Sequence, residues 1–206
     1  MNRKIILDLC GGTGAWSRPY KEAGYDVRVI TLPVHDVLAY VPHDDIYGIL
    51  VAPPCTHFSV SGAQYWKQKD ADGRTFEDIR ILTHCLMIIA KTSPVFWAIE
   101  NPVGRMRKLL GNPTLLFNPC DFGDPWTKKT LLWGQFNLPE KCPVNPEFVT
   151  ASNGDRYSKI MMSTGGKSAK TKKLRSMTPP GFAEAFFKAN NKGWYGDRNC
   201  HRERIE

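Results

Sequence analysis

The sequence of 206 residues can form one substantial hydrophobic core but is short for two independent domains, so we expect a single domain. With 42% hydrophobic and 23% charged residues, its composition excludes wholesale disorder. The formal net charge of +8 predicts an anionic partner, and nucleic acid fits better than a membrane because no strongly amphipathic basic helix is present. The first apolar run ends at Asp8, too short for a signal sequence or membrane span, which predicts a cytoplasmic protein.

Four short apolar runs have the composition of parallel strands buried on both faces: residues 5–9, 25–31, 47–52 and 94–100. Helical patterns separate them at residues 17–24 and 74–91. This alternation predicts an α/β fold with a doubly wound, mostly parallel sheet, whose ligand sites lie at the carboxyl ends of the strands. In the longer helix one predicted buried face contains Phe76, Ile79, Leu82, Leu86 and Ile89.

The second half of the chain is less regular. We expect a short basic helix at residues 105–110, two strand-like runs within residues 114–134, and a final helix at residues 180–190. Between them, residues 137–173 are rich in proline and glycine and predict an extended, irregular insertion with one short strand near residues 160–162.

The first strand ends in the stretch LDLCGGTGAW, which places glycines between a strand and a helix. Such glycines allow a ligand to approach the backbone amides closely, and Asp8 stands at the strand end. The stretch is not G-x-G-x-x-G, and a plain tight turn is the alternative interpretation.

The third strand leads into APPCTHFSVSG, where two prolines stiffen the approach to Cys55. Cys55 is either a buried structural thiol or a nucleophile, and a position at a strand end near a helix start predicts a lowered pKa. The six cysteines contain no C-x-x-C pair, so we expect neither a zinc site nor, in a reducing cytosol, a disulfide framework.

The fourth strand ends in AIENP, and a carboxylate at the end of a buried strand is costly unless it is paired or protonated. Glu100 is therefore a candidate general acid, with an ion-paired or helix-capping glutamate as the alternative. Further on, Lys128 and Lys129 stand beside Trp126 and Trp133, which suits phosphate or base contact; taken alone, this pattern favours an edge strand.

Residues 167–175 form a run without acidic residues, which is a candidate nucleic-acid contact or simply a solvated face. The cationic residues of this run are Lys167, Lys170, Lys172, Lys173 and Arg175.

These stretches, in this order, resemble the C5-cytosine DNA methyltransferase family, especially its small, phage-type members. DLCGGTG is similar to the family's cofactor loop, PPCTHFSVSG to its P-C-Q-x-F-S-x-x-G motif, and ENP to its E-N-V motif. FGDPWTKKT is similar to Y-G-x-P-Q-x-R-x-R, and RSMTPPGFAEAF to the closing segment. The resemblance implies a Rossmann-like methyltransferase fold and covers about residues 5–134 and 174–189.

The resemblance implies a DNA cytosine-5 methyltransferase in which Cys55 attacks cytosine C6 while Glu100 protonates N3. The activated C5 then takes a methyl group from S-adenosylmethionine. Ser59 is expected to support the nucleophile loop and Lys128 to act as a point charge. The residues implied in cofactor binding are Asp8, Gly12, Thr13, Gly14, Asp36, Pro54, Ser176 and Met177.

Several positions depart from the family pattern. Thr31 stands where an acidic residue contacts the ribose, and Cys10 where an aromatic residue stacks on adenine. Thr56 replaces glutamine, Pro102 replaces valine, and the two arginines of the Q-x-R-x-R motif are Lys128 and Thr130. Only the insertion at residues 137–173 remains in place of a target recognition domain, which predicts weak or very short sequence specificity.

Two alternatives remain open at this point. One is an enzyme that modifies C5 of cytosine in RNA or in a free nucleotide, and the other is a catalytically silent DNA-binding protein with the same fold. Nothing in the sequence indicates a metal site, a membrane or an obligate protein partner.

Overall fold

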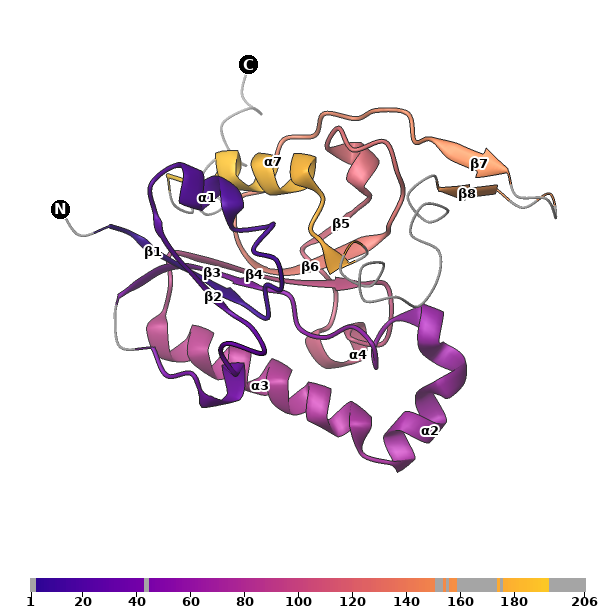
Figure 1. The fold of residues 1–206 in the computed structure, drawn as a ribbon, viewed down its shortest axis with the longest axis horizontal. Helices are drawn as coiled ribbons and strands as arrows, with labels where there is room; N and C mark the ends of the chain where they lie inside the picture. The colour runs from indigo at the N-terminus through magenta and orange to yellow at the C-terminus, as the bar shows by residue number, and fades with distance from the viewer. Residues whose placement is uncertain are drawn as a thin grey trace, which may run out of the picture.

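The computed structural model describes residues 3–42, 45–150, 154, 156–158, 174 and 176–192. Its centre is a six-stranded sheet in the order β2-β1-β3-β4-β6-β5 (Figure 1). The first four strands in this order are parallel, and β6 runs antiparallel between β4 and β5. The sheet strands are β1 (Ile5–Leu9), β2 (Asp26–Ile30), β3 (Ile46–Val51), β4 (Phe96–Pro102), β5 (Leu115–Phe117) and β6 (Thr130–Gln135).

Helices cover both faces of this sheet, so the predicted doubly wound α/β fold is confirmed. Figure 1 shows α3 on one face, and α1 and α7 together on the other. The helices are α1 (Arg18–Glu22), α2 (Trp66–Ala71), α3 (Arg74–Thr92), α4 (Arg107–Leu110) and α7 (Pro180–Asn190). Within the described residues, no helix is both long and apolar enough to cross a membrane.

The two faces of the sheet have different cores because successive residues of a strand point to opposite sides. Along β3, Ile49 and Val51 belong to an aliphatic cluster with Leu82 and Ile88 of α3. Leu50 belongs to the second cluster, which is mostly aromatic and fills the space beneath α1 and α7. Its aromatic members are Trp16, Tyr20, Phe96, Phe117, Phe122, Phe136, Phe182 and Phe186.

One residue of the predicted buried face of α3 is wrongly assigned. Phe76 is 63% exposed, whereas Thr75 and Asp78 of the same turn are buried. The first turn of α3 packs against α2 and the loop after β3, where polar partners are available, rather than against the sheet. Helical spacing predicted the helix, but it could not show that the first turn packs against polar groups instead of the sheet.

The interpretation of residues 127–134 as an edge strand is also wrong. β6 pairs with β4 on one side and β5 on the other, and Leu131 and Leu132 are fully buried. The two lysines precede the strand rather than lie in it.

Part of the predicted irregular insertion forms a small hairpin, β7 (Phe148–Thr150) with β8 (Arg156–Ser158). This hairpin is a separate two-stranded sheet at one end of the molecule (Figure 1). The short strand expected near residues 160–162 lies outside the described residues.

Gly48 is the position in the sheet that should tolerate a side chain least. A Cβ at Gly48 would lie 2.2 Å from the ring of Phe96, which is fully buried between β3 and α7. We expect Gly48→Ala to lower the free energy of unfolding by about 1–3 kcal/mol, because the close-packed ring cannot move without disturbing its neighbours. Urea denaturation of this variant measures the change, with Met87→Ala, at an exposed position of α3, as a control that should lie within about 0.5 kcal/mol of the parent.

Candidate active site

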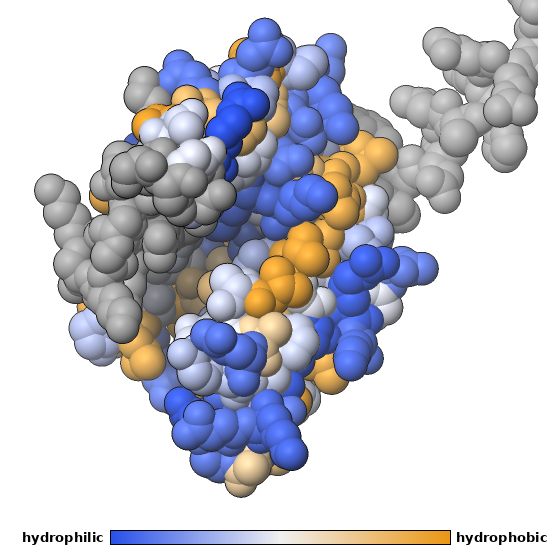
Figure 2. Space-filling view, turned by 90° about the vertical axis from the view of Figure 1, so that its right-hand side faces the viewer, coloured by the Kyte–Doolittle hydropathy of each residue, from blue (hydrophilic) through white to orange (hydrophobic). Residues whose placement is uncertain are grey.

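Three strands end at the same edge of the sheet. Leu9 of β1 pairs with Val51 of β3, and Val51 pairs with Ile99 of β4. The stretches that leave these strands are therefore neighbours: the glycine turn after β1, the loop carrying Cys55 after β3, and Glu100 near the end of β4. Figure 2 faces this side of the molecule and shows a hollow near its middle, bordered by hydrophobic and polar residues.

The glycine turn is left-handed at three positions, Cys10 (φ 58°), Gly12 (φ 56°) and Gly14 (φ 67°). A Cβ at Gly12 would meet no atom within 4 Å, so this turn faces open space, and both Gly12 and Thr13 are exposed. A Cβ at Gly11, in contrast, would overlap the Asp8 carboxylate. The turn thus presents bare backbone outward and rests on Asp8 beneath it.

Asp8 is fully buried rather than exposed in the hollow. Ser17 Oγ donates a hydrogen bond of 2.5 Å to Asp8 Oδ2, while Oδ1 has no partner among the described residues. Burial raises the pKa of Asp8 to about 6, and the Ser17 hydrogen bond opposes this shift. Any influence of Asp8 on a ligand therefore passes through the turn.

The remaining candidate cofactor residues lie on other segments of the chain. Asp36 is exposed and its Oδ1 accepts a 2.9 Å hydrogen bond from the amide of Leu38, capping a short 3-10 helix. Ser176 and Met177 lie a few residues before α7. Trp16, just beyond the glycine turn, has a ring contact of 6.0 Å with Phe182 of α7, so this helix packs against the segment that follows β1.

The loop after β3 is fixed to both neighbouring strand ends. The amide of Ala52 donates to Leu9 O (3.0 Å), and Asn101 Nδ2 donates to Pro53 O (3.2 Å). Asn101 is fully buried, so the ENP stretch holds the proline pair that precedes Cys55. Half-buried Pro54 completes this pair, and Cys55 itself is exposed.

Beyond Cys55 the loop forms a tight turn. The amides of Phe58 and Ser59 both donate to Cys55 O (3.1 and 2.9 Å), and Phe58 is anchored in the core with 1% of its surface exposed. Ser59 Oγ lies 2.8 Å from Ser61 Oγ and caps a 3-10 helix at Val60–Tyr65. Ser59 therefore supports the loop through its backbone and this cap.

The loop also runs beside the extension of β4. Arg105 N donates to Phe58 O (2.9 Å) and Val60 N to Val103 O (3.0 Å). Between these bonds a Cβ at Gly104 would lie 1.9 Å from Phe58 O, so only glycine fits. The nucleophile candidate and the acid candidate are thus on two backbone segments in direct contact.

Cys55, Glu100 and Lys128 affect one another electrostatically. Burial raises the pKa of Cys55, the nearby Glu100 carboxylate raises it further, and Lys128 lowers it. Burial likewise raises the pKa of Glu100, and Lys128 opposes that shift. Although Cys55 is exposed, the surrounding atoms exclude enough water to disfavour its thiolate, so the predicted lowered pKa of Cys55 is wrong.

A set of charged residues beneath this loop was not predicted from the sequence. His57 Nδ1 lies 2.6 Å from Asp78 Oδ2, and Lys69 Nζ donates to Thr56 O (2.7 Å). Arg105 Nε donates to His57 O (2.8 Å). Lys69 is only 7% exposed, and its only signal in the sequence is its position in a short helix that follows the loop.

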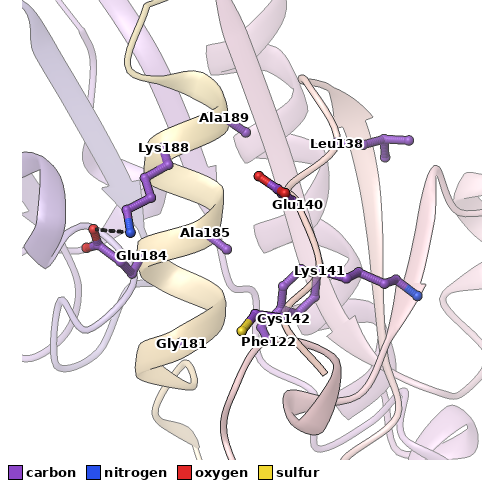
Figure 3. Close-up of a pocket in the computed structure, with 10 residues that line it drawn as sticks. All are labelled: Phe122, Leu138, Glu140, Lys141, Cys142, Gly181, Glu184, Ala185, Lys188 and Ala189. Atoms are coloured by element: carbon purple, nitrogen blue, oxygen red, sulfur yellow. Dashed lines mark ion pairs between the residues drawn. The ribbon is translucent and has the colours of Figure 1, made fainter. Parts of the chain in front are cut away.

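The basic run at residues 167–175 lies outside the described residues. A separate groove lies between α7 and residues 138–142 (Figure 3), where Ala185 and Ala189 face Glu140 and Cys142. None of the candidate catalytic or cofactor residues lines it.

No family model matches the sequence. The chain is 25% identical to the type II methyltransferase M.DdeI of Desulfomicrobium norvegicum over an alignment of 191 residues, covering 70% of this chain and 43% of that protein. The chain thus spans less than half the length of this relative. Independently of this match, the structure brings the first four of the five motifs to one edge of the sheet. This match agrees with the resemblance of the motifs to C5-cytosine DNA methyltransferases.

Two solved structures are also similar to this chain. One is a protein named as a DNA modification methyltransferase encoded within a prophage (E. coli), with 19% identity, a TM-score of 0.45, and coverage of 69% of this chain and 53% of that one. The other is the Entamoeba histolytica methyltransferase EhMeth, with 12% identity, a TM-score of 0.45, and coverage of 73% and 59%.

The structure shows what takes the place of the second arginine of the family's Q-x-R-x-R motif. Thr130 begins β6, is 1% exposed, and donates from Oγ1 to Lys128 O (2.8 Å). Threonine carries no charge, and Lys128 of this segment is the cation that lowers the pKa of both Glu100 and Cys55.

Asp8 should make stability depend on pH. Because the folded-state pKa of about 6 exceeds the ordinary value of 3.8, the native state binds the proton more tightly, and stability falls as pH rises through this window. Between pH 4.5 and 7.5 we expect Asp8 to account for a loss of about 2 kcal/mol, at 1.36 kcal/mol per pKa unit. Urea unfolding at both pH values should show this component in the parent and not in Asp8→Asn; an equal loss in both proteins would contradict it.

The reactivity of Cys55 should report the charges around it. Removing the carboxylate in Glu100→Gln should lower the pKa of Cys55, and removing the cation in Lys128→Met should raise it. The pH dependence of iodoacetamide alkylation, followed on the Cys55 peptide by mass spectrometry, measures both shifts. Exposed Cys142 in the same samples is the control, and its profile should not move. Shifts of the same sign in both variants would contradict the arrangement.

Proposed function

We propose that this protein is an S-adenosylmethionine-dependent DNA cytosine-5 methyltransferase with Cys55 as the nucleophile and Glu100 as the general acid. The observation that carries this proposal is the convergence of Cys55, Glu100 and Lys128 at the ends of β3, β4 and β6, beside the glycine turn of β1. Four motifs that are far apart in the sequence lie together at this edge of the sheet, as the residues of one active site must.

The glycine turn fits a ligand that binds against the backbone, because a side chain at Gly12 would project into open space. Gly12, Thr13 and Gly14 would hold the methionine end of the cofactor, with Asp8 supporting them from below. Exposed Asp36 would contact the adenine, while Pro54, Ser176 and Met177 would complete the pocket. When bound, S-adenosylmethionine supplies an electrophilic methyl group.

Glu100 suits the role of a proton donor because burial raises its pKa. Its carboxyl group would donate a hydrogen bond, and then the proton, to N3 of the cytosine. Protonation withdraws electrons from the ring and makes C6 open to attack. Lys128 beside it would stabilise the carboxylate that remains.

Cys55 would lose its proton to solvent and form a bond from Sγ to C6. The electron pair released from the C5–C6 double bond makes C5 the nucleophile that accepts the methyl group. A base, for which a water molecule suffices, then removes the C5 proton. The double bond re-forms, Cys55 leaves as the thiolate, and the N3 proton returns to Glu100. Protonated Glu100 no longer raises the pKa of Cys55, so the proton donor also favours the thiolate.

A cytosine in duplex DNA must leave the base stack to reach this site, at a cost of a few kcal/mol. Contacts from the basic run at residues 167–175 to phosphates would offset part of that cost and would be sensitive to salt. We propose that residues 137–173 replace a full target recognition domain in a single catalytic domain, which leaves sequence specificity weak or very short.

The test is the formation of 5-methylcytosine. Purified protein is incubated with mixed-sequence duplex DNA and S-adenosylmethionine, and the nucleosides are analysed by mass spectrometry. Cys55→Ala should reduce the product by roughly a thousandfold or more, because the proposed bond to C6 is made by the Cys55 thiol. Cys142→Ala, which removes another exposed thiol, should retain activity.

Each of the other outcomes would indicate a different function for this protein. 5-Methylcytosine in RNA or free nucleotides but not in DNA would show that DNA is not the substrate. A different group on C5 would show that the reaction is not methyl transfer. Salt-dependent DNA binding without any modified base would indicate a silent binding protein. Cys55-independent 5-methylcytosine would overturn the covalent mechanism.

A further inference from the structure

Two cations lie directly beneath the residues that follow Cys55. Lys69 Nζ donates to Thr56 O at 2.7 Å, and Arg105 Nε donates to His57 O at 2.8 Å. They therefore hold two consecutive carbonyl groups of the same turn. Both side chains are shielded from solvent, Lys69 at 7% exposure and the Arg105 side chain at 13%.

Arg105 is the more extensively bound of the two. Its guanidinium donates to both oxygens of Asp70 (2.8 Å each) and to Thr75 Oγ1 (2.6 Å). It also lies 4.9 Å above the ring of Trp66. One side chain thus joins the turn to α2, through Asp70 and Trp66, and to the first turn of α3, through Thr75.

The backbone of Arg105 adds a second connection. Its amide donates to Phe58 O (2.9 Å), and it stands five residues after Glu100 on the same segment. Since the Arg105 side chain reaches His57 O and its amide reaches Phe58 O, this residue sets the distance between the segment of Glu100 and the turn of Cys55.

Lys69 occupies a space that the sequence leaves free for it. A Cβ at Gly62 would lie 3.3 Å from Lys69 Nζ and 3.5 Å from Thr56 O. A side chain at residue 62 would therefore crowd the ammonium group and its acceptor. Burying an ammonium group costs free energy unless it is hydrogen-bonded. Lys69 therefore needs the carbonyl of Thr56 as an acceptor, and this requirement fixes the position of the turn.

We propose that Arg105 and Lys69 are positioning residues of the active site, which fix the direction of the Cys55 side chain by binding the carbonyl groups of Thr56 and His57. This role rests on the proposed function for its effect on catalysis, but its effect on Cys55 itself does not. Both residues act through the protein groups that they bind. Their contribution is to hold the sulfur where it meets Glu100 and Lys128.

The test compares Arg105→Met and Lys69→Met with two controls. Arg80→Met removes an arginine of α3 whose side chain is 53% exposed and pairs only with Glu77 among the contacts described. Phe136→Leu removes core packing beneath α7, on the other face of the sheet. This variant shows what a loss of stability alone does, without any change in the turn that positions Cys55. Arg105→Lys tests geometry, because an ammonium group cannot bind His57 O, Asp70 and Thr75 together.

The first readout is the pH profile of Cys55 alkylation, which needs neither DNA nor cofactor. With the turn released, the sulfur becomes more accessible to water and moves out of the field of Glu100, so the pKa of Cys55 should fall towards its ordinary value in Arg105→Met and Lys69→Met. Arg80→Met and Phe136→Leu should keep the parent profile. A parent profile in both positioning variants would overturn the proposal, whatever the reaction of the enzyme.

The second readout is methyl transfer to DNA. A displaced nucleophile should lower kcat by about 10- to 100-fold while KM for DNA stays within about threefold, and Arg105→Lys should recover only part of the loss. A loss that follows the melting temperature, and that Phe136→Leu reproduces, would show a structural role only and overturn the proposal. Absence of methyl transfer in the parent protein would instead count against the proposed function, with the alkylation result still standing.

Discussion

The register of β1, β3 and β4 is the constraint on which the candidate active site depends. Leu9, Val51 and Ile99 are fully buried and lie side by side, so three chain segments leave the sheet at one edge. The side-chain period of a strand is two residues, so a slip by one residue would turn Glu100 to the opposite face of the sheet. The two unlike cores resist such a slip, because aliphatic side chains fit beneath α3 and aromatic ones beneath α7.

The segments that leave this edge are bound to one another by hydrogen bonds and close backbone contacts. Asn101 binds the carbonyl of Pro53, and Gly104 allows the segment after β4 to contact the backbone of Phe58. Two cations bind the carbonyls of Thr56 and His57. Burial within this frame raises the pKa values of both Cys55 and Glu100. The nearby Glu100 carboxylate adds to the shift of Cys55.

The sequence predicted what depends on local composition. Apolar runs and helical spacing located β1 to β4, α3 and α7, and the order of the motifs indicated which loops share an edge. Features set by distant partners were not predictable. β6 resembles an edge strand until β5 is known to pair with it, and Phe76 follows the helical pattern although the first turn of α3 faces polar groups. Cys55 was expected to have a lowered pKa because a helix was expected after it. A 3-10 helix follows instead, and Glu100 faces the sulfur.

The packing of Trp16 against α7 also bears on how the protein acquires its structure. Trp16 lies just beyond the glycine turn, and its ring contacts, at 6.0 and 5.4 Å, are with Phe182 and Phe186. The turn formed by some of the first residues of the chain therefore reaches its final packing only after residue 186 has been synthesised. Contacts between residues so far apart in sequence close large loops and slow folding. The glycine turn should therefore be among the last of the described segments to reach its final packing.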